Sequence, residues 1–418
     1  MTKFHYFLGR LKKKLWVRPT VMSLVAIGWV TMAYGMQFFV KGAWPFDIEK
    51  GTLTSLFAIL ASSMLTVATF AVSALVAAFS GVSSTSTPRA RVLVMSDGTA
   101  QTALASFVGA FIYAIVALVA LSGLSYGTVG RFGLFVGFVI TVAFVLMSFL
   151  RWVALVSNLG GLDDTIDRAE AASLKVFSSV STVGGLGGRE YDESEKIPDG
   201  TDIVSLQIGY LCHVDTAALG VLAERLEAEL WLRVRPGTFV DTARALATVV
   251  GPASLSEEDH ASLRDAFTIS QARDLSVDPR FALIVLSEIA DRSLSASAND
   301  TGTSIRVMGV QLRLFAQWVE TRRLVETREA EFPRVRVPAL AVNDLLNDAF
   351  MATVRSGAAY IEVALRLQKS FRALANLGRE DLRQAAHFHA QLALEQALEK
   401  ITVEFYRERL RAIALKKP

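Results

Sequence analysis

The chain has 418 residues, of which 52% are hydrophobic and 20% are charged. Soluble globular domains contain about 45–50% apolar residues, so this composition points to a membrane-embedded portion. Residues 1–152 carry 12 Lys and Arg against 3 Asp and Glu, whereas the other 266 residues carry 31 against 37. The basic residues flank apolar runs and form no soluble basic patch, which argues against nucleic acid as a partner and favours lipid headgroups.

The N-terminal segment places Lys12, Lys13 and Lys14 before an apolar run, an arrangement also found in secretory signal peptides. The run reaches about 20 residues and no small-residue cleavage site follows it, so we expect a retained helix. The single cysteine, Cys212, permits no intrachain disulfide and fits a reduced, cytosolic setting.

Four apolar runs in the first third of the chain are long enough to cross a bilayer. They cover residues 21–40, 53–79, 103–124 and 132–152, and about 20 residues span a hydrocarbon core of about 30 Å. None carries a charge until its end, and one central Asp or Lys costs about 2.5–3.5 kcal/mol on insertion scales. The sequence therefore predicts four transmembrane helices within a domain of residues 1–152.

Loop charges predict the orientation of these helices. Six Lys and Arg residues precede the first run, Arg89 and Arg91 lie between the second and third runs, and only Arg131 lies between the third and fourth. Because cytoplasmic loops carry the excess of Lys and Arg, both termini are expected in the cytoplasm. The chain is thus expected to be a multi-pass protein of a bacterial inner membrane.

Hydroxyl residues form one stripe along the second run. At 100° per residue, six Ser and Thr side chains point within about 40° of one direction. They are Ser55, Ser62, Thr66, Thr69, Ser73 and Ser80.

Two interpretations of this stripe are open. It can line a water-filled path, because hydroxyls replace part of an ion's hydration shell without the insertion cost of a charge. It can instead serve helix packing, because small hydroxyl residues let helices approach and hydrogen-bond. The two agree if the stripe faces the axis of an oligomer. For the small-residue pair Gly133 and Gly137 in the fourth run, helix packing is the favoured reading.

After residue 152 the hydropathy falls and the charge rises, which predicts a cytosolic domain. Residues 203–212 and 230–234 are expected to be extended, with a helix over 217–227 between them that Asp215 caps. Residues 153–250 are therefore expected to form an α+β module.

From residue 256 onward helical patterns dominate, so residues 251–418 are expected to be a helical region. It should end in one long helix over 379–412. The glycine-rich segment 184–188 lacks the Lys-Ser/Thr pair of a phosphate-binding loop, so we expect a flexible connector there. The expected fold class is a mainly α membrane protein, with four transmembrane helices followed by a helix-rich α+β cytosolic domain.

Two stretches carry a resemblance to a known family. One contains Ser63-Met64-Leu65-Thr66-Val67-Ala68 and the exit-loop pair Pro88-Arg89, and the other contains Asp278-Pro279-Arg280-Phe281 and Asn299-Asp300. In both, the chain resembles the bacterial predicted membrane proteins catalogued as domain of unknown function 2254. The resemblance covers nearly the whole chain and implies an inner-membrane location. It brings no established activity.

The polar candidates of the second half are Asp278, Arg292, Asn299 and Asp300. Asn299 and Asp300 precede a helical run, so they are expected to cap it. The alternative is a cation or ligand site that they form with Asp278 and Arg292. No Ser, His and acid constellation and no metal-spaced cluster is found, so we expect no enzyme, no metal and no cofactor.

These features lead to an expected function. The favoured hypothesis is an oligomeric ion channel or pore, with the lipid bilayer, further copies of the chain and inorganic ions as its partners. In it the second helix lines the path, and the cytosolic domain assembles and gates it. The alternatives are a membrane-anchored ligand sensor or scaffold and, third, a small-solute transporter.

Overall fold

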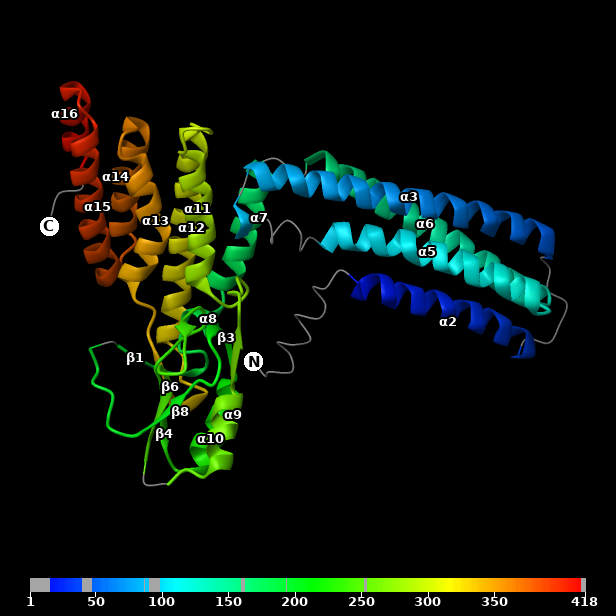
Figure 1. Cartoon of the computed structure of the whole chain (residues 1–418), viewed down its shortest axis with the longest axis horizontal. Helices are drawn as coiled ribbons and strands as arrows, with labels where there is room; N and C mark the ends of the chain where they lie inside the picture. Colours follow the sequence, from blue (N-terminus) through cyan, green and yellow to red (C-terminus); the bar gives the residue numbers. More distant parts are fainter. Residues whose placement is uncertain are drawn as a thin grey trace. The chain divides into compact units, whose positions relative to one another are not determined.

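The computed structural model describes residues 16–39, 47–85, 87–89, 98–158, 162–192, 194–251 and 254–414. The chain groups into two compact units, whose helices and strands are drawn in Figure 1. The membrane unit comprises Leu8–Thr85 and Arg91–Asp164. Of the described residues, the C-terminal domain comprises 165–414, with the gaps given above, together with the short segment 87–89.

The membrane unit contains, among the described residues, four helices long and apolar enough to cross a bilayer, as the sequence predicts. They are α2 (Val17–Phe39), α3 (Lys50–Thr85), α5 (Gly98–Gly123) and α6 (Thr128–Asn158). Each begins a few residues before its apolar run, and α3 and α6 also end later. The reason is that a formed helix gains one hydrogen bond for each residue added, whether or not that residue is apolar.

Helix α5 is the most enclosed of the four and packs against α2, α3 and α6. Phe57 of α3 meets Tyr113 of α5 and Phe138 of α6 edge to face, with ring centroids 5.4 and 5.7 Å apart. In lipid the hydrophobic effect does not drive helices together, so van der Waals contacts of this kind stabilise their association. At one end of the unit Arg131 donates to Asp47 at 2.7 Å.

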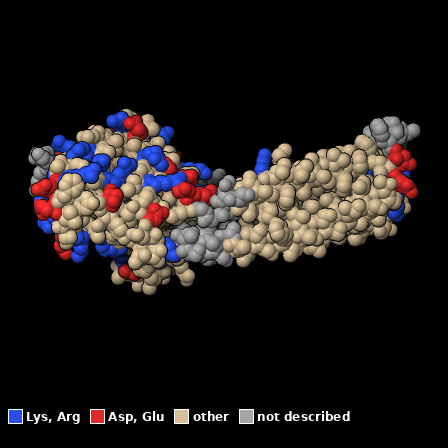
Figure 2. Space-filling model, turned by 90° about the horizontal axis from the view of Figure 1, so that it is seen from above, with Lys and Arg blue, Asp and Glu red and all other residues tan. Residues whose placement is uncertain are grey.

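The outer surface of the membrane unit is apolar over most of its length. Figure 2 shows its long flank almost free of charged side chains, whereas Lys, Arg, Asp and Glu are spread over the C-terminal domain. On α6 the exposed residues include Val139, Ile140, Leu146 and Leu150, each at least half exposed. A surface of this kind suits hydrocarbon and not water.

Gly133 and Gly137 of α6 lie at close helix contacts. Trp29 donates its indole N–H to the Gly133 carbonyl at 3.1 Å, and the Tyr113 hydroxyl donates to the Leu134 carbonyl at 2.7 Å. A methyl group at Gly137 would overlap both the Trp29 indole nitrogen and the Tyr113 hydroxyl. The small residues therefore let α2, α5 and α6 approach each other within one chain.

The C-terminal domain contains two small sheets among the described residues. The five-stranded sheet has the order β1-β8-β4-β6-β2, in which β8 pairs in parallel with β1 and β4, and the other pairs are antiparallel. The antiparallel three-stranded sheet has the order β5-β3-β7. The strands are β1 (Gly188–Tyr191), β2 (Thr201–Val204), β3 (Gly209–Val214), β4 (Glu229–Leu232), β5 (Phe239–Val240), β6 (Ala245–Val250), β7 (Phe267–Ser270) and β8 (Phe332–Pro338).

Helices make up the rest of this domain. Helices α11 to α16 stand together as a helical layer (Figure 1), in which α13 contacts both α11 and α15, and α14 contacts both α12 and α16. A buried aromatic row through Phe315, Phe350 and Phe371 joins three of them, with ring centroids 6.2 and 5.1 Å apart. The helices are α7 (Leu162–Phe177), α8 (Val180–Val183), α9 (Thr216–Arg225), α10 (Glu257–Asp265), α11 (Pro279–Ser293), α12 (Thr301–Glu326), α13 (Val342–Gly357), α14 (Ile361–Ala375), α15 (Glu380–Lys400) and α16 (Glu404–Ile413).

Strand β8 lies within the segment expected to be helical. Its core alternates, so that Val335 and Val337 are fully buried while Arg334 and Arg336 are not. Pro333 and Pro338 occur near its ends, where a missing N–H is tolerated. The alternation of valine and arginine is the period-2 signal of a strand, and the two prolines disfavour a helix there.

Three further expectations are corrected by the structure. The extended run 203–212 is divided into β2 and β3, and the single long helix over 379–412 is broken between α15 and α16 by extended, β-branched residues at 401–403. Segment 184–188 is a packed turn and not a flexible connector. A side chain at Gly185 or Gly188 would overlap a neighbouring backbone carbonyl.

The substitution Gly137→Ala should destabilise the membrane unit by about 1–3 kcal/mol, because the added methyl overpacks a filled contact. The measurement is thermal unfolding of the full chain in detergent. Gly28→Ala is the matched control, since nothing lies within 4 Å of a methyl group at that position of α2. Equal stability of the two variants would contradict the packing role.

Candidate functional site

The hydroxyl stripe lies on the face of α3 that the other helices leave uncovered. Its described side chains are all exposed, namely Ser55, Ser62, Thr66, Thr69 and Ser73. The opposite face carries Leu53, Phe57 and Met64, which are buried against the rest of the unit. Ser80 belongs to α3, but its side chain lies outside the described residues. Within the described part of the chain, the stripe therefore faces away from α2, α5 and α6.

Each described stripe hydroxyl donates a hydrogen bond to a carbonyl of its own helix. The acceptors lie three or four residues earlier, at 2.9–3.1 Å. The donor is thus satisfied inside the helix, which makes the group tolerable in a membrane. The oxygen lone pairs still face outward and can accept from water or contact a cation.

The outer face of α3 differs from that of α6, where no described Ser or Thr side chain is exposed. From Ser55 to Ser73 the α3 stripe extends about 27 Å at 1.5 Å per residue, nearly the thickness of a hydrocarbon core. Large apolar side chains border it, including Ile59, Leu65 and Phe70. The stripe is thus a narrow polar line on a largely apolar surface.

Asp278 and Asp300, candidates for one shared site, lie at opposite ends of α11. Asp278 caps the start of α11 and pairs with Arg273 at 2.7 Å. The backbone N–H of Asp300 donates to the carbonyl of Ser293, at the other end of that helix. A helix of 15 residues is about 22 Å long. The two carboxylates therefore do not form a common site.

Asp300 is the N-cap of α12, the role that the sequence favours for it, and Asn299 directly precedes it. The Asp300 carboxylate accepts from the backbone N–H of Thr303 at 3.0 Å and from its hydroxyl at 2.6 Å. Asn299 has φ of 46°, a left-handed conformation that asparagine tolerates better than most residues. Arg292 lies in the last turn of α11, at the same end as Asp300.

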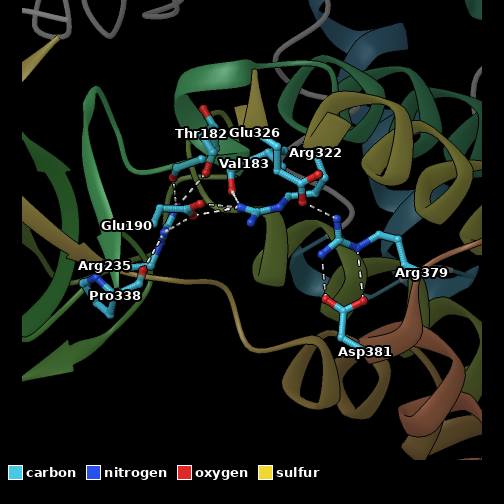
Figure 3. A network of polar contacts seen from close by, with 10 residues as sticks. Thr182, Val183, Glu190, Arg235, Arg322, Glu326, Pro338, Arg379 and Asp381 are labelled. Atoms are coloured by element: carbon cyan, nitrogen blue, oxygen red, sulfur yellow. Dashed lines mark hydrogen bonds and ion pairs between the residues drawn. The ribbon is translucent and has the colours of Figure 1, made fainter. Parts of the chain in front are cut away.

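Sequence reasoning missed a buried ionic network between the sheet and the helical layer (Figure 3). Arg322 of α12 donates to both carboxylate oxygens of Glu190 on β1, at 2.8 and 2.6 Å, and Arg235 lies 3.8 Å from the same carboxylate. The three side chains are only 10–18% exposed. Glu190 and Arg322 are 132 residues apart in the sequence, so no local pattern could have paired them.

Arg235 uses its guanidinium to join three carbonyl groups. It donates to Thr182 at 2.8 Å, Gly184 at 2.7 Å and Pro338 at 2.6 Å, so it connects the end of α8 to the end of β8. Burial lowers the pKa of Arg235 to about 10, and the charge of Glu190 opposes that shift. Arg235 therefore remains charged at neutral pH.

Arg379 continues these connections across the helical layer. It donates to Glu326 of α12 at 2.6 Å and to both carboxylate oxygens of Asp381 at 3.1 and 2.8 Å. Its guanidinium also lies 5.2 Å from the centre of the Trp318 ring. These charged side chains are hydrogen-bonded to other groups of the same domain. The network therefore has a structural role and connects the sheet to the helical layer.

A shallow depression of about 510 Å³ opens beside this network. It lies where the parallel strands β1 and β8 end, a position at which open α/β sheets bind ligands. Asp192, Asn343, Asp381 and Phe388 contribute to its lining. Among the described residues, no three His, Cys, Asp or Glu side chains gather into a group that could hold a metal.

Four apolar helices followed by a helix-rich domain with some sheet define a multi-span membrane protein. The chain belongs to the family described as predicted membrane protein (DUF2254), whose pattern matches residues 12–373. The family resemblance of the sequence is thereby confirmed. No curated protein and no solved structure matches the chain.

The substitution Glu190→Gln should destabilise the C-terminal domain by about 3–5 kcal/mol, because it leaves two buried guanidinium groups without a counter-charge. Hydrogen exchange of β1 and α8 in the full chain measures the change. Glu320→Gln removes an exposed partner of Arg323 from the same helix α12 and should cost less than about 1 kcal/mol. An equal loss of stability in the two variants would contradict the structural role of Glu190.

The cap at Asp300 should make the first turn of α12 sensitive to acid. Hydrogen bonds from Thr303 lower the pKa of Asp300 below its ordinary value of 3.8, so the stabilisation is present above that value and is lost as the pH falls through the lower, folded value. Asp300→Ala should cost about 1 kcal/mol at pH 7, whereas Asp300→Asn should keep most of the cap without the pH dependence. Hydrogen exchange of this turn, measured from pH 7 down to a pH below 3.8, tests the acid sensitivity and the effects of the two substitutions.

Proposed function

We propose that this membrane protein is an oligomeric ion channel or pore, in which the α3 helices of several copies surround a water-filled path. The observation that supports it is the uncovered hydroxyl stripe. Exposed polar side chains in a row nearly as long as the hydrocarbon core suit water or ions better than lipid. Their satisfied donors and free lone pairs favour contact with cations.

In this proposal the C-terminal domain assembles and gates the path. Helix α7, which follows the last span in the chain, is bound to α12 by two ion pairs. Arg306 contacts Asp167 at 2.6 Å, and Arg313 binds both carboxylate oxygens of Glu170 at 2.5 and 2.7 Å. Helix α12 also carries Arg322 of the buried network, so α7 and β1 are held by the same helix.

The proposed setting is a bacterial inner membrane with both termini in the cytoplasm, which the loop charges support. The proposed function is not enzymatic, and its partners are the bilayer, further copies of the chain and inorganic ions.

A channel should show currents when the purified full chain is placed in planar bilayers. Thr66→Leu should reduce the conductance severalfold, because it replaces a hydroxyl of the stripe with a bulky apolar group. Ser63→Leu is the matched control, since Ser63 is an exposed hydroxyl residue of α3 about 80° away from the stripe direction. Its conductance should equal that of the unchanged protein.

A second measurement tests directly whether the stripe is accessible to water. With the only native cysteine removed as Cys212→Ser, Thr66→Cys should react with a charged thiol reagent, whereas Ile140→Cys on the apolar face of α6 should not. The channel proposal would be overturned if no current appears under varied voltage, tension and ions, and if neither cysteine reacts with the reagent.

That negative outcome would favour the second candidate, a membrane-anchored ligand sensor or scaffold. The depression at the ends of β1 and β8 is the observation in its favour. The third candidate, a small-solute transporter, typically has broken helices at the membrane midplane. The described spans are continuous helices, which does not favour a transporter.

A further inference from the structure

A cavity of about 560 Å³ lies at the end of the membrane unit where α5 begins. Three helices line it: α2 through Arg18, α5 through its first residues, and α6 through the segment from Phe144 to Arg151. None of the described residues lining it is acidic. Neither the stripe of α3 nor the network of the C-terminal domain belongs to it.

Arg18 holds a positive charge at the N-terminus of α5. Its guanidinium donates to the carbonyl of Gly98 at 2.5 Å and to the hydroxyl of Thr102 at 2.6 Å. A Cβ at Gly98 would lie 3.2 Å from a guanidinium nitrogen, so the group rests on the first residue of the helix. A helix N-terminus carries partial positive charge and favours anions. A cation fixed there raises a potential that is already positive.

Two polar groups of α6 also line the cavity. The charge of Arg151 adds to the positive potential, and the hydroxyl of Ser148 adds a hydrogen-bond donor. Arg151 is exposed and has no hydrogen-bond or ion-pair partner among the described residues. Ser148 is 6% exposed and lines the cavity. Asp97, the acidic residue next to Gly98 in the sequence, lies outside the described residues.

One side of the cavity is apolar and open. Phe144 and Met147 of α6 line it and are 41% and 56% exposed. Both belong to a candidate span, so their surroundings are expected to be hydrocarbon. The cavity thus joins two cations at the end of a span to an apolar surface along the same span.

We propose that this cavity binds an anionic phospholipid. The phosphate accepts hydrogen bonds from Arg18, Arg151 and Ser148, and an acyl chain lies along Phe144 and Met147. Basic pockets between transmembrane helices bind lipid headgroups in this way. The proposal is independent of the channel function, because the cavity and the stripe share no residue.

Native mass spectrometry of the detergent-purified full chain tests this site, with phosphatidylglycerol and phosphatidylcholine as the added lipids. The unchanged protein should retain phosphatidylglycerol in preference to phosphatidylcholine. Arg151→Gln should weaken phosphatidylglycerol binding on the order of fivefold, the effect of one arginine near a membrane surface, and Arg151→Lys should keep most of it.

Arg131→Gln is the matched control. Arg131 is also an arginine of α6, but it pairs with Asp47 and does not line the cavity. Its substitution should leave lipid binding unchanged. Equal retention of the two lipids, or equal weakening by Arg151→Gln and Arg131→Gln, would overturn the proposal.

Inorganic phosphate distinguishes the lipid from a free anion. Millimolar phosphate should not displace phosphatidylglycerol from the unchanged protein, because phosphate has no acyl chain to contact Met147. Displacement at that concentration would show a site for free phosphate and would overturn the assignment to lipid. The thermal transition of each variant confirms that it is folded.

Discussion

The C-terminal domain depends on one interaction, the pairing of the Glu190 carboxylate with Arg322 and Arg235. The three side chains are largely removed from water. A buried charge is costly unless it is paired and hydrogen-bonded, and here one carboxylate serves a strand and a helix at once. Arg235 extends the connection to the carbonyls at the ends of α8 and β8. The sheet and the helical layer are thus joined by charge as well as by apolar packing.

The membrane unit follows a different constraint. In hydrocarbon every backbone N–H and C=O must be paired internally, so the apolar first third of the chain forms continuous helices. The contacts between them use small residues and aromatic edges, as at Gly137 and Phe57, because burial of apolar surface gains little in lipid. Charge is largely confined to the ends of the unit, where Arg131 pairs with Asp47 and Arg18 sits at the start of α5.

The polar features that remain on the membrane unit are the places where function is proposed. Among the described residues, no helix covers the stripe of α3, and the cavity at Arg18 and Arg151 gathers positive charge without a described acidic residue in its lining. The proposed aqueous path is assigned to the first feature, and the proposed anionic headgroup to the second.

The sequence by itself determined the four spans, the small-residue contact in α6 and several helix caps. Each depends on residues close together in the chain: a run of about 20 apolar residues, a spacing of four, or a cap next to its helix, as at Asp215 and Asp300. It also predicted the direction shared by the stripe residues, because that direction follows from 100° per residue.

Only the tertiary structure decided which groups meet across long separations. It showed that the stripe faces outward, that Asp278 and Asp300 lie at opposite ends of α11, and that β8 completes a sheet begun more than a hundred residues earlier. The same holds for Glu190 and its two arginines. Periodicity fixes the direction of a side chain relative to its own helix or strand, but which element covers that side chain is decided by the packing of distant segments.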